Sequence, residues 1–194
     1  MDKQQSVSQT PEQKLRGVRH RQMLLSLRRW LPLTLAALLI VVLVWGIASI
    51  PVIRIYGTSM SPTLADGELC IALRENEYLP GDMIAFSRDG KVLTRRVIAG
   101  PGSNVSMDES GAVSVDGILL EETYLTGTAL GQCNIRFPYL VPEGQYLVLG
   151  DNREQAVDSR STVFGCVRSD EIIGKLYLRF WPFSSFCRNL YDET

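Results

Sequence analysis

The chain has 194 residues, of which 45% are hydrophobic and 21% are charged, and its formal net charge is −1. The charge is unevenly distributed: the first 30 residues hold seven Lys and Arg against two Asp and Glu, whereas the remainder holds 13 against 19. Because the longer part is acidic and has no basic patch, the composition gives no indication of nucleic-acid binding.

The basic leader, residues 1–29, precedes an uncharged apolar run, Leu31–Ile50. Residues 1–13 are rich in Gln, Ser and charge and are expected to be disordered. At about 1.5 Å per residue, a helix of about 20 residues reaches roughly 30 Å, the thickness of a hydrocarbon core. Residues 30–50 are therefore predicted to form one transmembrane helix, with a cytoplasmic N-terminus and an extracytoplasmic remainder.

Two alternatives for the apolar run remain at this point. Gly46-Ile47-Ala48 loosely resembles the small-x-small site at which a secretory signal peptide is cleaved. Against this, both the run and the basic leader are long for a signal peptide. A buried core helix would be expected to show a polar face, which the run lacks.

Residues 51–194 break into short β-type runs separated by Asp-Gly, Pro-Gly and Ser-Gly turn signals, without long helical periodicity. This pattern predicts a mainly β domain of antiparallel sheets, large enough for one core. Residues 103–144 are less regular and are a possible subsidiary lobe. The predicted strands are Val52–Tyr56, Glu68–Leu73, Asp82–Ser87, Val92–Ile98, Val105–Met107, Ala112–Val115, Gln145–Leu149 and Gly174–Trp181.

All four cysteines, Cys70, Cys133, Cys166 and Cys187, lie in this domain. An extracytoplasmic location permits disulfides, but four cysteines allow three pairings and their spacing selects none. Buried free thiols are the alternative. Because there is no CxxC motif and no histidine cluster, neither a metal site nor a cofactor is expected.

Four segments occur in a characteristic order: the apolar run, Gly57–Leu64 (GTSMSPTL), Gly81–Phe86 with Arg95–Gly102, and Gly150–Arg160 (GDNREQAVDSR). Together they resemble the bacterial type I signal peptidase family, membrane-anchored serine proteases that remove signal peptides from exported proteins. The resemblance covers most of the chain from Leu31 onward. It implies a single-pass protein of the cell membrane that cleaves exported preproteins after small residues of the Ala-x-Ala type. The oligomeric state is not implied.

The resemblance also implies roles for individual residues. Ser59 would attack the scissile carbonyl, and its backbone N–H, with the Gly57-Thr58 turn, would face the developing oxyanion. Met60 would offer apolar surface to a pocket for small side chains. The substrate would be an extended peptide that docks as an added β-strand.

The last segment supplies four charged residues, Asp151, Arg153, Asp158 and Arg160. They are expected to form a structural group of ion pairs and hydrogen bonds that supports the site. The alternative is that Asp158 or Asp151 serves as a weak carboxylate base with a raised pKa.

Two positions depart from the family pattern. The family's general base is a lysine, and here that position holds Arg95. A buried lysine can lose its proton near neutral pH, whereas a guanidinium stays protonated and can only donate hydrogen bonds. The family usually has a serine that orients this lysine, and here that position holds Ala156.

Other candidate bases are few. His20, the only histidine, lies in the leader and is predicted to be across the membrane from Ser59. Lys91 precedes Arg95 by four residues, which is roughly 13 Å along a strand. Lys175 belongs to the last predicted strand and to none of the four segments.

Two functions follow as alternatives. The first is an active signal peptidase with Ser59 as nucleophile. The second is a catalytically impaired homologue that keeps the peptide groove and acts as a peptide-binding or pilus-assembly factor, because base and orienting partner are lost together. A related self-cleaving repressor is excluded, since the chain has an apolar run and no DNA-binding region.

Overall fold

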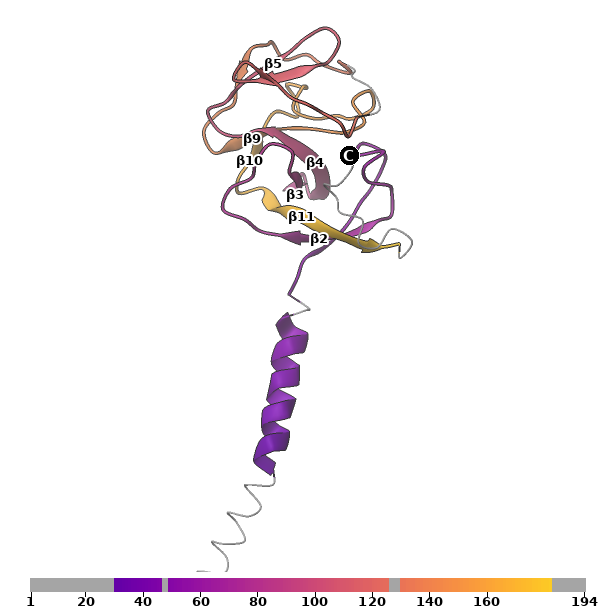
Figure 1. Cartoon of the computed structure of the whole chain (residues 1–194), viewed down its shortest axis with the longest axis vertical. Coiled ribbons are helices and arrows are strands. Elements are labelled where there is room, and N and C mark those ends of the chain that lie inside the picture. The colour runs from indigo at the N-terminus through magenta and orange to yellow at the C-terminus, as the bar shows by residue number, and fades with distance from the viewer. Residues whose placement is uncertain (1–29, 47–48, 126–129, 183–194) are drawn as a thin grey trace, which may run out of the picture. The chain divides into compact units, whose positions relative to one another are not determined.

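The computed structural model describes residues 30–46, 49–125 and 130–182 (Figure 1). The chain divides into two compact units, Met1–Ser49 and Ile50–Thr194. In the first unit, residues 30–46 form a helix with exposed side chains. None of the helices in the described part of the chain has both the length and the apolar character that crossing a membrane requires. The predicted span of residues 30–50 includes residues 47 and 48, which lie outside the described residues, as does the leader.

The second unit is built around a seven-stranded sheet in which every strand pair is antiparallel (Figure 1). The strand order is β1-β2-β11-β3-β4-β9-β10. The strands are β1 (Val52–Arg54), β2 (Leu69–Leu73), β3 (Met83–Arg88), β4 (Lys91–Ala99), β9 (Gln145–Leu149), β10 (Val167–Arg168) and β11 (Ile172–Trp181).

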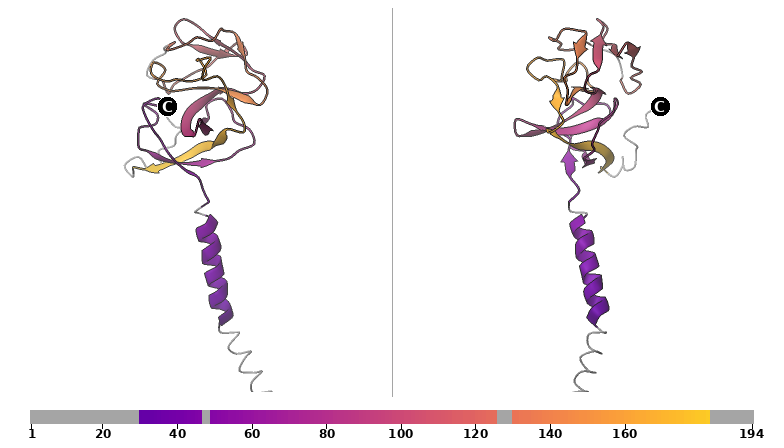
Figure 2. Two further views of the ribbon diagram at one scale, coloured as in Figure 1. Left: turned by 180° about the vertical axis from the view of Figure 1, so that it is seen from behind. Right: turned by 90° about the vertical axis from the view of Figure 1, so that its left-hand side faces the viewer.

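A smaller antiparallel sheet has the strand order β7-β6-β5-β8. Its strands are β5 (Asn104–Met107), β6 (Val113–Val115), β7 (Ile118–Leu119) and β8 (Tyr139–Leu140). In Figures 1 and 2 this sheet occupies the end of the unit that is remote from β2. All four strands fall within the segment for which a subsidiary lobe is predicted, but they belong to the same compact unit as the large sheet.

The prediction of a mainly β, antiparallel fold is confirmed. Each of the eight predicted strands coincides with an observed one, with ends that differ by a few residues. The strands β7, β8 and β10 were not predicted. Each has only two residues, too few to show the alternation of apolar and polar side chains that marks a strand.

The large sheet carries apolar side chains on both faces, as β3 shows. Met83 and Ala85 belong to one buried cluster, whereas Ile84 and Phe86 belong to another. Successive residues of a strand point to opposite faces, so β3 is covered on both sides. This explains its continuous apolar sequence, which is typical of a central strand buried on both faces rather than of an edge strand.

Strand β4 has a complete set of partners along only part of its length. Its residues from Lys91 to Arg96 all pair with β3, whereas pairing with β9 begins only at Arg96. Within the described ranges, the half from Lys91 to Arg95 therefore has a strand partner on the β3 side alone. This half-open edge runs directly to Arg95.

Three cysteines are described, and all three are free thiols: Cys70, Cys133 and Cys166. Cys70 is fully buried in the core of the large sheet. Burial raises the pKa of its thiol to about 12, with the Glu68 carboxylate adding to the effect. Cys187 lies outside the described residues.

Candidate active site

Ser59 lies in a tight turn that follows β1. Gly57 begins the turn with a φ of 78°, a left-handed conformation that favours glycine, and its N–H donates to Asp66 Oδ1 at 2.7 Å. The Ser61 N–H then donates to the Thr58 carbonyl at 3.1 Å. Gly57, Thr58 and Ser59 all line the same pocket.

Met60, next in sequence, is almost fully buried in the core cluster that also contains Ile53, Ile55 and Leu64. It nevertheless forms part of the pocket wall. The turn is thus anchored in the core immediately after the candidate nucleophile. The proposed contact of Met60 with small substrate side chains stays a prediction.

The segment Gly150–Arg160 fastens this turn from a second side. Asn152 donates from its backbone N–H to the Ser59 carbonyl at 3.0 Å, and from Nδ2 to the Thr58 carbonyl at 3.2 Å. The Thr58 hydroxyl in turn donates to Gln155 Oε1 at 3.0 Å. Two motifs far apart in the sequence therefore form one site.

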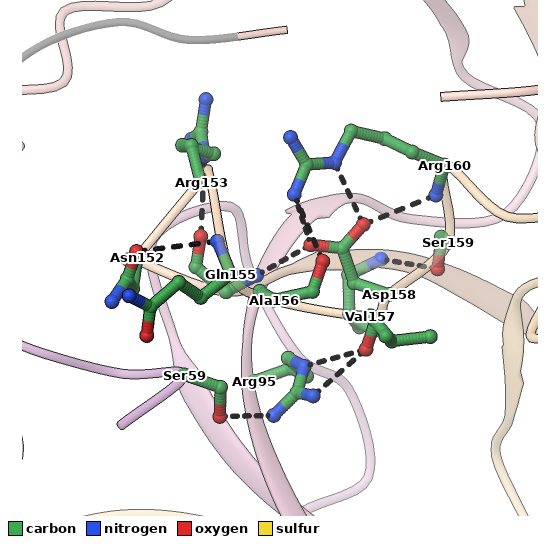
Figure 3. Close-up of polar contacts among 12 residues, drawn as sticks. Ser59, Arg95, Asn152, Arg153, Gln155, Ala156, Val157, Asp158, Ser159 and Arg160 are labelled. Carbon is green, nitrogen blue, oxygen red and sulfur yellow. Dashed lines mark hydrogen bonds and ion pairs between the residues drawn. The ribbon is translucent and has the colours of Figure 1, made fainter. Parts of the chain in front are cut away.

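A third motif, Arg95–Gly102, contributes Arg95 to this site, and the Arg95 side chain points at Ser59 (Figure 3). Its side chain is 6% exposed, and Nη1 donates to Ser59 Oγ at 2.7 Å. The guanidinium is held by carbonyl oxygens: Nη1 donates to Thr94 at 2.6 Å, while Nη2 and Nε donate to Val157 at 2.8 and 3.3 Å. The serine oxygen is therefore a hydrogen-bond acceptor in this pair, not a donor.

Arg95 cannot act as the base that a lysine provides. Burial lowers its pKa from the ordinary value, while the nearby Asp158 carboxylate opposes that shift. A guanidinium nevertheless remains protonated at neutral pH and has no lone pair to offer. It can hold an oxygen and stabilise negative charge on it, but it cannot accept the Ser59 proton.

Neither lysine described in the β unit is placed to substitute. Lys175 Nζ lies 2.7 Å from Asp82 Oδ1 in an ion pair. Its Cα pairs with that of Ile84, which pairs with that of Arg95, so Lys175 is two strands from the site. Lys91 is exposed at the far end of β4. His20 lies outside the described residues.

The charged residues of the Gly150–Arg160 segment do not form a single group. Asp158 and Arg160 pair with each other through two hydrogen bonds of 2.8 Å, and the Gly150 N–H donates to Asp158 Oδ2 at 3.0 Å. Both charges are nearly inaccessible to solvent, and both Asp158 oxygens are engaged in holding Arg160 and Gly150.

Asp151 and Arg153 pair instead with residues that were not among the predicted site residues. Asp151 accepts two hydrogen bonds from Arg96, at 2.9 and 2.6 Å, and Arg153 pairs with Glu122. Arg96 belongs to a recognised motif, next to Arg95, and could have been considered. Glu122 lies in the irregular segment between the small strands, and no sequence signal links it to Arg153.

The pocket beside Ser59 has a volume of about 300 Å³. It is lined by both segments that could receive an extended peptide: residues 55–60, which follow β1, and residues 92–95 of β4, together with Gln155. Ala156 is buried next to this site. A side chain at Gly150 would collide with the Cβ of Ala156.

Within the described ranges, no three His, Cys, Asp or Glu side chains gather into a metal site.

Comparison with known proteins shows which family the chain is similar to. The family model described as "Signal peptidase, peptidase S26" matches residues 27–181. Signal peptidase IB of Staphylococcus aureus strain Mu50 is 33% identical over 189 residues, which covers 87% of this chain and 96% of that protein. Signal peptidase I of Bacillus licheniformis is 31% identical, with 82% and 91% covered.

A solved structure also matches: a signal peptidase I from Enterococcus faecalis V583, with 31% identity and a TM-score of 0.45, over 52% of this chain and 97% of that one. The extent of the family match and the identity to full-length relatives are sufficient for assignment. The chain belongs to the signal peptidase family, peptidase S26.

Proposed function

We propose that the chain is a membrane-bound signal peptidase that removes signal peptides from exported preproteins after small residues. The observation that carries the proposal is the position of Ser59 in a pocket shared by the family's motifs. The apolar run of residues 30–50 would anchor the protein, with the basic leader in the cytoplasm and the β unit outside. The signal peptidases among its relatives support this substrate class.

The substrate would bind as an added strand. The Lys91–Arg95 half of β4 lacks a partner strand on one side among the residues that the structure describes, and unpaired N–H and C=O groups of such an edge can pair with an extended peptide. Because this half ends at Arg95, a peptide that follows it is led toward Ser59. The pocket of about 300 Å³ beside Ser59 would receive the residues next to the cut.

In the chemical step, Ser59 Oγ would attack the carbonyl carbon, and the Ser59 N–H with the Gly57-Thr58 turn would face the developing oxyanion. Arg95 would stabilise negative charge on the attacking oxygen through its 2.7 Å hydrogen bond. The hydroxyl proton would pass to water or hydroxide, because Arg95 cannot take it. Turnover is therefore expected to be slow at neutral pH. Collapse of the tetrahedral intermediate would break the peptide C–N bond, with the leaving amine taking a proton from water. A second water would then hydrolyse the acyl-enzyme, which frees Ser59 and leaves a carboxylate on the signal peptide.

A preprotein cleavage assay with the purified full-length chain tests this function. The wild type is expected to cleave slowly, and Ser59→Ala is expected to abolish cleavage. Arg95→Lys with Ala156→Ser restores the family's base and its orienting partner. Since general-base catalysis contributes about 10²–10⁴-fold, this double variant is expected to be faster by a factor of that order. Cleavage by the wild type that survives in Ser59→Ala would refute the assigned nucleophile.

The hydrogen bond from Arg95 to Ser59 favours a second candidate, a catalytically impaired homologue that binds exported peptides, for example in pilus assembly. Under that function the wild type does not cleave, the Arg95→Lys/Ala156→Ser variant does, and Ser59→Ala leaves the cellular phenotype unchanged. The two functions thus give opposite results for the wild type in the same assay.

A further inference from the structure

Five arginines are buried among the described residues of the β unit, and one of them differs from the rest. Four have a carboxylate within ion-pair distance: Arg96 pairs with Asp151, Arg153 with Glu122, Arg160 with Asp158 and Arg179 with Glu68. Arg95 has no such carboxylate among the described residues. All of its hydrogen bonds go to neutral oxygens, those of Ser59, Thr94 and Val157.

A buried charge without a counter-charge is costly, and buried charges are therefore usually paired. Asp158 is close enough to raise the pKa of Arg95. Its two oxygens, however, already accept hydrogen bonds from Arg160 and from the Gly150 N–H. The positive charge at Arg95 thus has no carboxylate of its own in the described β unit.

The charge also lies at a place that a ligand can reach. Arg95 and Ser59 line the same pocket of about 300 Å³. Because Ser59 Oγ accepts the hydrogen bond from Arg95 Nη1, the hydroxyl proton is free to be donated to a further acceptor. A guanidinium and a hydroxyl donor side by side form a suitable site for a carboxylate.

We propose that Arg95 and Ser59 form a receptor for the C-terminal carboxylate of an extended peptide that ends in a small residue. The identity of this peptide rests on the proposed function, since cleavage after a small residue releases such a terminus. The half-open edge of β4 would align the peptide, and the pocket would hold its last side chain. The released signal peptide would then stay bound and inhibit the next turnover.

Arginine gives this site a property that a lysine base would not have. A lysine whose pKa is near 7–8 loses its charge in the alkaline range, whereas a guanidinium keeps it. The peptide carboxylate is ionised above about pH 4. Binding of the carboxylate is therefore expected to be nearly constant from about pH 6 to pH 9.

The test is a binding titration of the full-length protein in detergent micelles with two peptides of one sequence ending in Ala-x-Ala. One carries a free C-terminal carboxylate and the other a C-terminal amide. Charge-assisted hydrogen bonds predict that the carboxylate form binds about 10- to 100-fold more tightly. Arg95→Gln is expected to reduce this preference to less than about threefold, and circular dichroism checks that the variant is folded.

Two further variants test whether the preference depends on the charge at position 95. Arg168→Gln removes an exposed arginine that pairs with Asp170 away from the pocket, and it is expected to keep the full preference. Arg95→Lys is expected to keep a preference at pH 6 and to lose most of it at pH 9. Equal affinities for the two peptides, no binding of either, or a preference that survives in Arg95→Gln would each overturn the proposal.

These outcomes are separate from those of the cleavage assay. Preprotein cleavage without a carboxylate preference would support the proposed function and contradict the carboxylate receptor. A carboxylate preference without cleavage would support the carboxylate receptor and contradict the proposed function.

Discussion

Gly150 lies so close to Ser59 that a Cβ on Gly150 would be 2.6 Å from the Ser59 carbonyl oxygen. That oxygen also accepts the hydrogen bond from the Asn152 N–H, at 3.0 Å. The segment after β9 therefore packs backbone against backbone on the turn that carries the serine. The position of Ser59 depends on a residue without a side chain in a distant part of the sequence.

Replacing Gly150 by alanine should damage the site. The new Cβ would meet the Ser59 carbonyl oxygen at 2.6 Å and the Ala156 Cβ at 2.3 Å, so the two segments must move apart. We expect Gly150→Ala to lower the free energy of unfolding by about 1–3 kcal/mol and to reduce peptide affinity. Urea denaturation and the peptide titration measure these effects. The control is Gly100→Ala, whose Cβ meets nothing closer than 3.8 Å; equal behaviour of the two variants would contradict the prediction.

The buried ion pair of Asp158 with Arg160 should be important for stability. Asp158→Asn leaves the Arg160 charge buried without a counter-charge, which typically costs about 3–5 kcal/mol. A large drop in the melting temperature is expected by calorimetry. Asp170→Asn breaks the exposed pair with Arg168 and is expected to leave the melting temperature nearly unchanged. A similar drop in both variants would show that burial is not the cause.

Cys70 should resist alkylation in the folded protein. Its thiol is fully buried and its pKa is about 12. At pH 8 the reagent therefore cannot reach the sulfur, and almost none of the thiol is ionised to the reactive thiolate. Cys133, which is only partly buried, is expected to react with iodoacetamide before Cys70 does. Peptide mapping by mass spectrometry, before and after denaturation, distinguishes the two. Rapid labelling of Cys70 in the native protein would contradict the described packing.

The same thiol should make stability depend on pH in the alkaline range. In the unfolded chain the thiol ionises near its ordinary value of 9.0, whereas in the folded protein it stays protonated until about pH 12. Between these values the unfolded state binds fewer protons, so this contribution to stability falls as the pH rises. Relative to Cys70→Ala, the wild type should lose more stability between pH 9 and 11. Parallel curves for the two proteins would exclude the effect.

The rate of cleavage should also depend on pH in a way that identifies the proton acceptor. If hydroxide takes the Ser59 proton, wild-type cleavage should rise steadily from pH 6 to pH 9. The Arg95→Lys/Ala156→Ser variant should instead reach a plateau once its lysine is neutral. Initial rates on a model preprotein across this range provide the comparison. A wild-type plateau near neutral pH would indicate a base that the site geometry does not provide.

The fold could be predicted to a large extent because the longer strands carry clear signals. The Pro-Gly and Asp-Gly turns bound β3 and β4, and the apolar run of β3 is long enough to be recognised. The short strand β10 could not be found in this way, because its two residues form a strand only by pairing with β9. Tertiary contacts, not local preference, define such elements.

The candidate site was predictable where the family resemblance assigns a role to a residue. The resemblance puts Arg95 at the position of the base that acts on Ser59, and the structure places the two residues in hydrogen-bond contact. The ion-pair partners were not predictable. Arg153 reaches Glu122 across the fold, although Asp151 is much closer in sequence. Charges that are adjacent in the chain need not pair with one another in a folded structure.

The half-open edge of β4 has a consequence for handling the protein. A strand edge that can receive a peptide can also pair with the same edge of a second copy, which is how exposed edges cause aggregation. Lys91 places a positive charge at the start of this edge, where two such charges would lie side by side and repel each other in a parallel, in-register pairing. Concentrated samples should therefore stay monodisperse more readily at low salt, where this repulsion is least screened.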